Sequence, residues 1–419
     1  MMHRAPQKIT RRTNCRLCSS DDLALAFSLA PTPPANAFVS ADHLNESQEV
    51  FPLDVFFCRA CTHLQLLDVV DPSVLFERYV YVSGTSPVFV RHFEKLTDDL
   101  AGLAGPLAGK LVVDIGSNDG TLLRAFQNRH QARTLGVDPA RNLAEEASAS
   151  GVETIADFFS AELARKIVGQ HGHAAVVAAN NVFAHIDDLG EVARGVKILL
   201  APEGYFVFEV SYLLDVVEKT LFDTIYHEHL DYHAVRPLIP FLQSHGLELI
   251  EAIRVPTHGG SLRGIARHKD AKSRMGSSVA SALSLEAQWG LERLSTYTDM
   301  AGRVTRLGEE LRSLLEQLKR QGKTIAGFGA PAKATTLMYH FRIDRDCIDF
   351  IVDDNPLKQN TYSPGLHVPI VAASALEERR PDYLVILAWN FADAIIEKTK
   401  RFADRGGKYI VPLPTVRVL

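Results

Sequence analysis

The chain has little of what marks a membrane, secreted or nucleic-acid-binding protein. None of its apolar runs is long enough to span a bilayer, and its basic first twelve residues lack the apolar core of a signal peptide. The net charge of -5 provides no excess of basic residues for binding nucleic acid. We therefore expect a cytoplasmic protein that has neither a membrane nor a nucleic acid as its partner.

The length of the chain sets its organisation. With 419 residues it exceeds what a single hydrophobic core usually supports, so two or three domains are expected. Charged residues make up 23% and apolar residues 46%, which is ordinary for globular proteins.

Cysteines are few, but four of the five form two Cys-x-x-Cys pairs, Cys15–Cys18 and Cys58–Cys61. Two such pairs supply four thiolates, which complete the tetrahedral shell of a structural zinc ion. Disulfides are the alternative, and a reducing compartment disfavours them. The pattern predicts one zinc ion that holds the fold and has no part in chemistry. Cys347 stands apart and is expected to be a buried apolar residue.

A strand, a glycine turn and a helix follow one another in residues 111–123. Residues 111–115 are apolar and β-branched, the turn runs from Gly116 to Gly120, and apolar residues then recur at helical spacing. Such a turn presents helix amides to a ligand at the carboxyl end of a sheet, although a tight turn without a ligand is the alternative. Asp138 ends the next strand, where doubly wound folds keep a carboxylate for ribose hydroxyls.

Strands alternate with helices through this part of the chain, which predicts an α/β fold with a parallel sheet. The expected strands are residues 111–115, 134–137, 152–155, 174–178 and 205–210. Residues in and beside the turns at one edge of this sheet are candidates for binding a ligand. They are Asp114, Gly116, Asn118, Gly120, Asp138, Asp157, Phe158, Asn180, Asn181 and His185.

Beyond the fifth strand, ionisable and phenolic groups crowd into the turn Tyr226-His227-Glu228-His229. A histidine with a pKa near 6.5 suits proton abstraction close to neutrality, while a solvated loop is the alternative. In an extended turn His227 and His229 would share a face, whereas in a helical turn Tyr226 and His229 would share one. We expect the second arrangement, and both His227 and His229 are candidates for the base.

Two further segments offer groups to a ligand. Tyr79 and Tyr81 belong either to the end of a strand or to a flap that presents phenols. His258 and Ser261 lie where a hairpin closes between two apolar strands.

Helix-forming residues from 272 to 320 predict long linking helices, after which a second nucleotide-binding pattern begins. Residues 324–335 again predict a strand, a glycine-rich turn and a helix start, where Lys333 could reach a phosphate. A repeat of the fold without a ligand is the alternative. The substrate-binding candidates are His258, Ser261, Gly329, Ala330, Pro331, Lys333, Asp353, Lys358 and Asn390.

These motifs resemble, in this order and over nearly the whole chain, those of sugar C-methyltransferases. The resemblance rests on the paired cysteines, the Asp-x-Gly-x-Asn-Asp-Gly turn, the Tyr-His-Glu-His turn and the Gly-Ala-Pro-Ala-Lys turn. Members of this family use S-adenosylmethionine to methylate C3 of a nucleotide-linked 4-keto deoxysugar in branched-sugar biosynthesis. One departure is Asn118, which stands where the methyltransferase turn usually carries its second glycine.

The resemblance implies an α/β protein with a zinc-binding domain, a central class I methyltransferase domain, a helical linker and a C-terminal Rossmann-like domain. Their expected limits are residues 1–75, 76–270, 271–320 and 321–419. The implied partner is the nucleotide-linked 4-keto deoxysugar, with its diphosphate in the C-terminal domain. The implied cofactors are structural zinc and S-adenosylmethionine, the latter on residues 116–120.

Within the S-adenosylmethionine site, Asp138 is expected on the ribose, Asp157 and Phe158 near the adenine, and Asn180 or Asn181 near the amino acid end.

The resemblance also implies catalytic roles. His229 would remove the C3 proton, while Tyr226, Glu228 and one of Tyr79 or Tyr81 orient the sugar or stabilise the enolate. A nicotinamide-dependent nucleotide-sugar oxidoreductase and a non-catalytic zinc-containing module that binds a nucleotide sugar are the alternatives. The dipeptide at residues 118–119 is a poor cradle for pyrophosphate, and a mere binding module would leave the Tyr-His-Glu-His turn unexplained.

Overall fold

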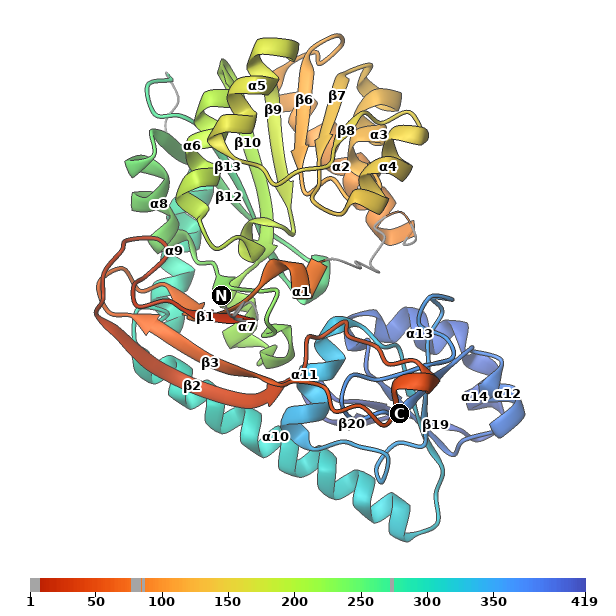
Figure 1. Ribbon diagram of the computed structural model, residues 1–419. Coiled ribbons are helices and arrows are strands. Elements are labelled where there is room, and N and C mark those ends of the chain that lie inside the picture. The colour runs from red at the N-terminus through yellow and green to blue at the C-terminus, as the bar shows by residue number, and fades with distance from the viewer. Residues whose placement is uncertain (1–7, 77–83, 85–86, 272–274) are drawn as a thin grey trace, which may run out of the picture.

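The structure is a computed structural model, and it describes residues 8–76, 84, 87–271 and 275–419. Two large sheet-containing parts lie at opposite ends of the molecule, and the smaller N-terminal part lies alongside both (Figure 1). No helix within the described residues is long and apolar enough to cross a membrane.

The N-terminal part is built on antiparallel strands. β1 pairs with β5, while β2, β3 and β4 form a sheet whose fourth strand, β11, comes from the central part of the chain. The elements of this part are β1 (Ile9–Arg11), β2 (Leu23–Thr32), η1 (Ala41–His43), β3 (Phe51–Cys58), β4 (Leu64–Leu66), β5 (Asp68–Val70) and α1 (Pro72–Phe76).

The central part is a seven-stranded sheet with the order β12-β13-β10-β9-β6-β7-β8. The strands β10, β9, β6, β7 and β8 are parallel, and the hairpin β12–β13 adds antiparallel strands at one edge. Its strands are β6 (Leu111–Ile115), β7 (Arg133–Val137), β8 (Thr154–Ile155), β9 (Ala174–Asn180), β10 (Leu200–Ser211), β12 (Leu247–Val255) and β13 (Ser261–His268).

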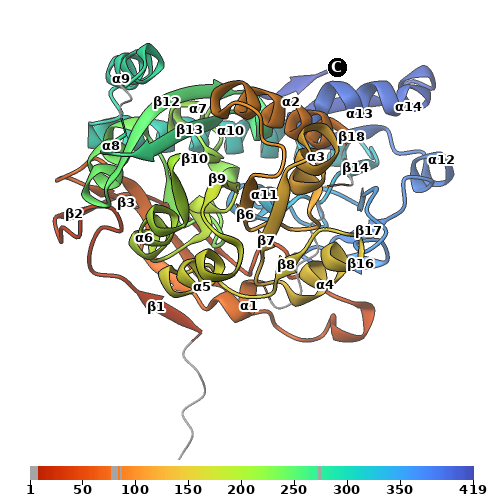
Figure 2. The same ribbon diagram turned by 90° about the horizontal axis from the view of Figure 1, so that it is seen from above.

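Helices cover both faces of the central sheet, as Figure 2 shows from above. The helices of this part of the chain are α2 (Pro87–Ala104), α3 (Thr121–His130), α4 (Arg141–Ala149), α5 (Ala161–His171), α6 (Leu189–Leu199), α7 (Leu213–Glu218) and α8 (Val235–Ser244), with short 3-10 turns η3 (Phe183–His185), η4 (Phe222–Thr224) and η5 (Thr257–Gly259). Val112 belongs to the core under α2 and α3, while Val113 belongs to the core under α5 and α6. Both faces of β6 are therefore buried, which explains its uninterrupted apolar sequence.

The limits of four of the five predicted strands differ in the structure. β7 begins one residue earlier, at Arg133, and β9 continues to Asn180. The strand predicted at residues 152–155 is reduced to β8 (Thr154–Ile155), because Val152 instead closes the preceding turn and packs against Gly120. The strand predicted at 205–210 begins earlier, since β10 starts at Leu200.

The C-terminal part is a second seven-stranded sheet, with the order β16-β17-β15-β14-β18-β19-β20 and five parallel inner strands. Its strands are β14 (Ile325–Phe328), β15 (Phe350–Val352), β16 (Thr361–Tyr362), β17 (Pro369–Val371), β18 (Tyr383–Ile386), β19 (Lys408–Val411) and β20 (Arg417–Val418). Its helical elements are α11 (Ala332–Phe341), α12 (Ala375–Arg379), η6 (Trp389–Phe391), α13 (Ala392–Lys398) and α14 (Lys400–Asp404).

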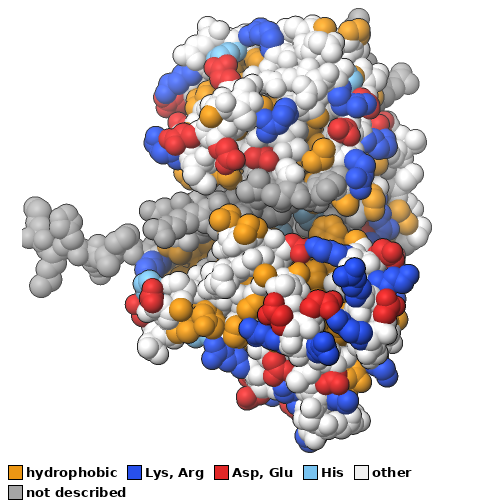
Figure 3. Space-filling view, turned by 90° about the vertical axis from the view of Figure 1, so that its right-hand side faces the viewer, with side chains coloured by type: hydrophobic (Ala, Val, Ile, Leu, Met, Phe, Trp, Pro, Cys, Tyr) orange, Lys and Arg blue, Asp and Glu red, His pale blue; other side chains and the backbone are white. Residues whose placement is uncertain are grey.

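Several connections join the parts. The predicted linker forms α9 (Ser277–Trp289) and α10 (Leu294–Arg320), and α10 contacts both β2 and α11. β11 (Asp231–Tyr232) pairs with β4, and Val39 forms a β-bridge with Tyr362. On the face seen in Figure 3, basic and acidic side chains intermix over both large parts, and no uniformly basic surface occurs there.

Candidate functional site

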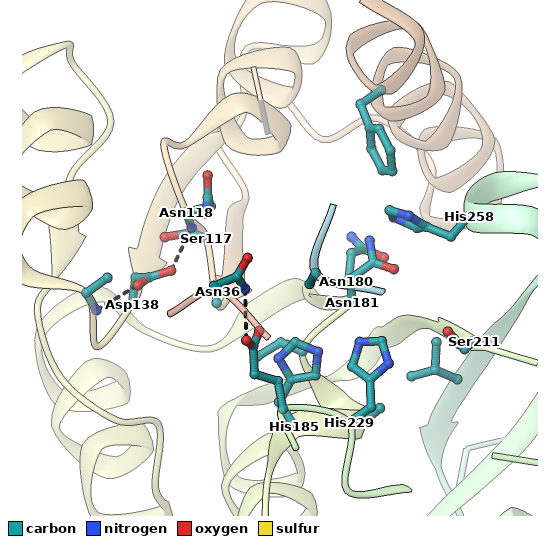
Figure 4. A pocket seen from close by; sticks show the side chains of 18 of the residues that line it. Asn36, Ser117, Asn118, Asp138, Asn180, Asn181, His185, Ser211, His229 and His258 are labelled. Carbon is teal, nitrogen blue, oxygen red and sulfur yellow. Dashed lines mark hydrogen bonds between the residues drawn. The ribbon is translucent and has the colours of Figure 1, made fainter. Parts of the chain in front are cut away.

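A cavity of about 490 Å³ lies where the three parts of the chain meet (Figure 4). Loops that follow the parallel strands of both large sheets line it, and Asn36 reaches it from the N-terminal part. Open α/β sheets bind their ligands at this carboxyl edge, so the cavity is the candidate active site.

Most of the residues predicted to bind ligands line this cavity. From the central sheet they are Asp114, Gly116, Asn118, Asp138, Asp157, Phe158, Asn180, Asn181 and His185. From the later segments they are Tyr226, Glu228, His229, His258, Gly329, Pro331, Lys333, Asp353, Lys358 and Asn390.

Three predicted residues do not line the cavity. Gly120 has a left-handed φ of 77° and lies against the side chain of Val152, behind the turn. Ser261 is fully buried and hydrogen-bonded within its own hairpin, and Ala330 is also buried. Tyr79 and Tyr81 lie outside the described residues.

The glycine turn after β6 is held by a carboxylate from the next strand. Gly116 has a φ of 70°, and an added Cβ there would meet Val182 at 2.8 Å. Asn118 has a φ of 52°, a left-handed conformation that asparagine tolerates, so its place in the turn needs no glycine. Asp138 accepts hydrogen bonds from the amides of Asn118 and Ala140, each at 2.8 Å.

The predicted catalytic segment forms a tight turn in which the amide of His229 donates to the carbonyl of Tyr226 at 2.8 Å. It is neither extended nor helical, but the Tyr226 and His229 side chains meet as the helical alternative predicted. The Nδ1 atom of His229 lies 2.8 Å from the carbonyl oxygen of Thr224 and therefore carries the proton. Its Nε2 atom is then the acceptor for the Tyr226 hydroxyl, also at 2.8 Å. The ring of His185 lies beside it, with centroids 4.9 Å apart.

His227 points away from the cavity. It is fully buried, its Nε2 atom lies 3.2 Å from the carbonyl oxygen of Phe51, and the two rings make an edge contact. Of the two histidines in the turn, only His229 lines the cavity.

Burial sets the protonation of the groups in this turn. It lowers the pKa of His229 to about 4, so the imidazole is neutral at neutral pH. Burial also raises the pKa of Glu228 to about 7, although the hydrogen bond from Asn36 and the charge of Lys358 oppose this rise. The Asn36 amide donates to the Glu228 carboxyl at 2.9 Å.

Lys333 enters the cavity from the first turn of α11. Its Nζ atom donates to Asn390 at 2.6 Å and lies 3.6 Å from the centre of the Trp389 ring. Burial lowers the pKa of Lys333 to about 8, while the charge of Asp223 opposes this shift. Asp223 in turn accepts the indole N–H of Trp389 at 2.6 Å.

The C-terminal glycine turn repeats the arrangement of the central one. Asp353 accepts hydrogen bonds from the amides of Ala330, at 2.6 Å, and Asn355, at 2.8 Å. The amide of Ala330 is therefore already hydrogen-bonded within the protein. Lys358 donates to the carbonyl of Ala330 at 2.9 Å and brings a second cation to the cavity.

Sequence reasoning missed Asn36, Asp223 and Trp389. Asn36 lies in a loop that is remote in sequence from Glu228, and the Asp223–Trp389 bond joins residues that are 166 positions apart. No local pattern carries such pairings. The only related indication in the sequence was the position of Asn390, the neighbour of Trp389, at the end of a predicted strand.

The four paired cysteines also come together as predicted. Their sulfurs lie within 4.8 Å of one another, with Cys15 and Cys61 3.6 Å apart and Cys18 and Cys58 3.6 Å apart. A disulfide needs a separation of about 2 Å, whereas tetrahedral Zn–S bonds of about 2.3 Å place sulfurs about 3.8 Å apart. The geometry therefore fits a zinc ion. Cys347 is buried, as expected.

Comparison with known proteins identifies the family. Models for a zinc binding domain, a methyltransferase domain and a C-methyltransferase C-terminal domain match residues 15–76, 89–252 and 256–414. The chain is 38% identical over 405 residues to the C-methyltransferase NovU of Streptomyces niveus, and the match covers 97% of this chain and 96% of that protein. The chain belongs to the C-methyltransferase family. This C-methyltransferase uses S-adenosylmethionine, and its four-cysteine cluster binds zinc.

Solved methyltransferases resemble part of this C-methyltransferase. Magnesium protoporphyrin IX methyltransferase from Synechocystis PCC 6803, with bound S-adenosylmethionine, is 16% identical and matches 43% of this chain and 80% of its own, with a TM-score of 0.32. An S-adenosylmethionine-dependent methyltransferase from Clostridium acetobutylicum is 12% identical and matches 43% of this chain and 92% of its own, with a TM-score of 0.35.

The central edge of the cavity fits S-adenosylmethionine. Both polar atoms of the Asn180 side chain and the Ser117 hydroxyl are buried without a hydrogen-bond partner among the described residues. Phe158 is 59% exposed beside the cavity, an unusual position for a large aromatic ring. A ligand with polar groups would satisfy the side chains of Asn180 and Ser117, and its aromatic base would cover Phe158.

Proposed function

We propose that this C-methyltransferase transfers a methyl group from S-adenosylmethionine to C3 of a nucleotide-linked 4-keto deoxysugar through an enolate, as a step in branched-sugar biosynthesis. The observation that carries the proposal is the shared cavity. It is lined by the glycine turn of the cofactor sheet, by the Tyr226–His229 pair and by two lysines of the C-terminal part.

His229 has the properties of the base. A proton beside a ketone is weakly acidic, so its removal requires an unprotonated base placed within the cavity. Burial keeps the imidazole neutral, and the bond from Nδ1 to Thr224 directs Nε2 to accept the proton. General base catalysis of this kind contributes about a hundred- to ten-thousand-fold.

Tyr226 is the assigned donor for the developing enolate oxygen. Its hydroxyl donates to Nε2 of His229 in the absence of substrate, and with the sugar bound it would turn to the enolate oxygen and leave Nε2 free to accept the C3 proton. One such donor contributes about 3 kcal/mol to the stabilisation of an oxyanion. Glu228, a carboxyl with a raised pKa beside Asn36, is assigned to orient the sugar.

The cofactor would be held by the turn at residues 116–120, with Asp138 on its ribose, Asp157 and Phe158 near its adenine, and Asn180 or Asn181 near its amino acid end. S-adenosylmethionine supplies an electrophilic methyl group. The protein's own task is to hold the substrate carbon in line at near-contact distance.

The nucleotide diphosphate is assigned to Lys333 and Lys358. Both are partly buried cations that line the cavity from the C-terminal part, and a diphosphate would supply an opposite charge for them.

The test is a panel of nucleotide-linked 4-keto sugars incubated with the enzyme and S-adenosylmethionine. Mass spectrometry should find a gain of one methyl group, and NMR of the product should place it on C3. A methyl group on an oxygen atom, or the absence of any methylated product across thymidine, guanosine and cytidine nucleotides, would contradict the proposal.

A further inference from the structure

Arg16 lies inside the first cysteine pair, directly after Cys15, and its side chain is completely buried. Its Nε atom donates to Asp187 at 3.0 Å, and its Nη1 atom donates to Gln65 at 3.2 Å and to the carbonyl of Leu66. Its guanidinium also lies 3.9 Å from the buried carboxylate of Asp231.

The two carboxylates beside Arg16 belong to the two loops that carry histidines into the cavity. Asp187 follows His185 by two residues, and Asp231 follows His229 by two residues. The Arg16 guanidinium therefore connects the first Cys-x-x-Cys pair to both of these loops. We call the two Cys-x-x-Cys pairs the first and second zinc knuckles.

Further bonds between the same loops support the connection. His63, which follows Cys61 by two residues, lies 2.6 Å from Asp231 through its Nε2 atom. The amide of Leu66 donates to the carbonyl of Leu230 at 2.9 Å, and the amide of Leu230 donates to the carbonyl of Ala184 at 2.8 Å.

We propose that Arg16 is a positioning residue, through which the zinc-bound knuckle sets the placement of His229 and His185 in the active site. The knuckle fixes the backbone of Arg16, because zinc binds the residue before it. The buried guanidinium then donates to Asp187, which Arg12 also binds at 2.9 Å, and lies beside the buried carboxylate of Asp231, which requires an opposite charge nearby. This inference rests on the proposed function, in which His229 is the base.

The second knuckle supplies a matched control. Arg59 follows Cys58 just as Arg16 follows Cys15, but its side chain is 55% exposed and pairs at 3.2 Å with Asp22, which is equally exposed. Exposed pairs of this kind contribute little to stability or geometry. Arg16→Met and Arg59→Met therefore remove the same group from equivalent knuckle positions, and only the first loses contact with the active-site loops.

The experiment compares these two variants with wild type and with His229→Ala. Four properties are measured: zinc content, the affinity for S-adenosylhomocysteine, kcat and KM for methyl transfer, and exchange of the substrate C3 proton with deuterated solvent. Arg16→Met should keep one equivalent of zinc and its affinity for S-adenosylhomocysteine. Its kcat and exchange rate should fall together by about tenfold to a hundredfold, the effect of misplacing a catalytic group by about 1 Å. Arg59→Met should match wild type.

A spectroscopic readout tests the position of His229 directly. In protein labelled with 15N-histidine, the Nδ1–H signal of His229 is identified by its loss in His229→Gln. This signal should shift or broaden in Arg16→Met and should be unchanged in Arg59→Met. A folded, zinc-bound Arg16→Met that has the wild-type exchange rate and the wild-type His229 signal overturns the proposal.

Asp187→Ala keeps the test decisive if Arg16→Met does not fold. Asp187 is 43% exposed, so its removal should leave the fold intact, and Asp22→Ala is its control in the other knuckle. A reduced exchange rate in Asp187→Ala alone supports the positioning role, and a wild-type rate overturns it. If His229→Ala exchanges the proton normally, the proposed base is wrong, which is a separate failure from that of Arg16.

Discussion

The Nε2 atom of His229 and the hydroxyl of Tyr226 lie 2.8 Å apart, and the centroids of the two rings are separated by only 4.0 Å. Their contact follows from a turn closed between the same two residues, which brings side chains three positions apart onto one side. A phenol and a neutral imidazole therefore enter the cavity together. At this position in the cavity, His229 supplies a proton acceptor and Tyr226 supplies a hydrogen-bond donor.

The first prediction separates the two histidines of the turn. His229→Gln should lower turnover and C3 proton exchange by roughly two or more orders of magnitude, because the proton acceptor is lost, while both ligands still bind. His227→Gln is the matched control, since His227 contacts Phe51 outside the cavity. Fixed-time assays of methyl transfer measure turnover, and incubation in deuterated solvent measures exchange of the C3 proton. If only His227→Gln is inactive, the wrong imidazole has been assigned.

The second prediction concerns Glu228 and pH. Burial raises its pKa to about 7 from 4.5, so the folded protein holds this proton more tightly than the unfolded chain does. The resulting stability is fully present below pH 4.5 and is lost as the pH rises through 7. Relative to Glu228→Gln, wild type should therefore lose about 2.5 kcal/mol of unfolding free energy between pH 5 and pH 8.

Urea unfolding of both proteins at the two pH values measures this difference. The exposed residue Glu145 provides the control, because Glu145→Gln should follow wild type at both pH values. A constant difference between wild type and Glu228→Gln across this range would show that Glu228 is already ionised at pH 5.

The central sheet and its ligand edge were predictable from the sequence, because their signals are local. The β6 strand, its glycine turn and α3 are each encoded by adjacent residues, and parallel strands bring their carboxyl ends to one edge. The four-cysteine cluster was predictable for a different reason. Two knuckles are too specific to occur without a shared metal.

Contacts between remote segments were not predictable. Asn36 reaches Glu228 only because the N-terminal part packs against the catalytic turn, and β11 completes the N-terminal sheet with residues 231–232. Both contacts join residues that the predicted limits assign to different domains, so those limits give no indication of them. The short β8 strand was also overestimated, since the apolar Val152 is buried as part of a turn and not of the ladder.

The third prediction uses the two equivalent carboxylates as controls for each other. Asp138→Ala should weaken binding of S-adenosylhomocysteine by about 1–3 kcal/mol, because the turn at Asn118 loses its acceptor and the ligand loses a carboxylate. Asp353→Ala should leave this affinity unchanged and raise KM for the nucleotide sugar. Calorimetry and steady-state kinetics measure the two effects. An unchanged affinity in Asp138→Ala would remove Asp138 from the cofactor site.

The fourth prediction concerns the metal. Purified protein should contain about one equivalent of zinc, because a closed four-thiolate site retains its ion. Cys58→Ser should lose zinc and unfold at a lower temperature, whereas Cys347→Ser should keep both properties, since Cys347 lies outside the cluster. Metal analysis and thermal unfolding provide the readouts. Less than about half an equivalent in wild type would contradict the assignment.

The last prediction concerns Lys333, the cation held between Asn390 and the face of Trp389. Replacing it with alanine removes a partly buried charge that the C-terminal part contributes to the cavity. If this charge binds the diphosphate, Lys333→Ala should raise KM for the nucleotide sugar about tenfold to a hundredfold, the value of one charge-assisted hydrogen bond. The affinity for S-adenosylhomocysteine should not change.

Lys398→Ala is the control, because it removes a half-exposed lysine from the same part, where its partner is Asp354. Loss of cofactor affinity with an unchanged KM for the sugar would instead place the two ligands in the opposite parts of the cavity.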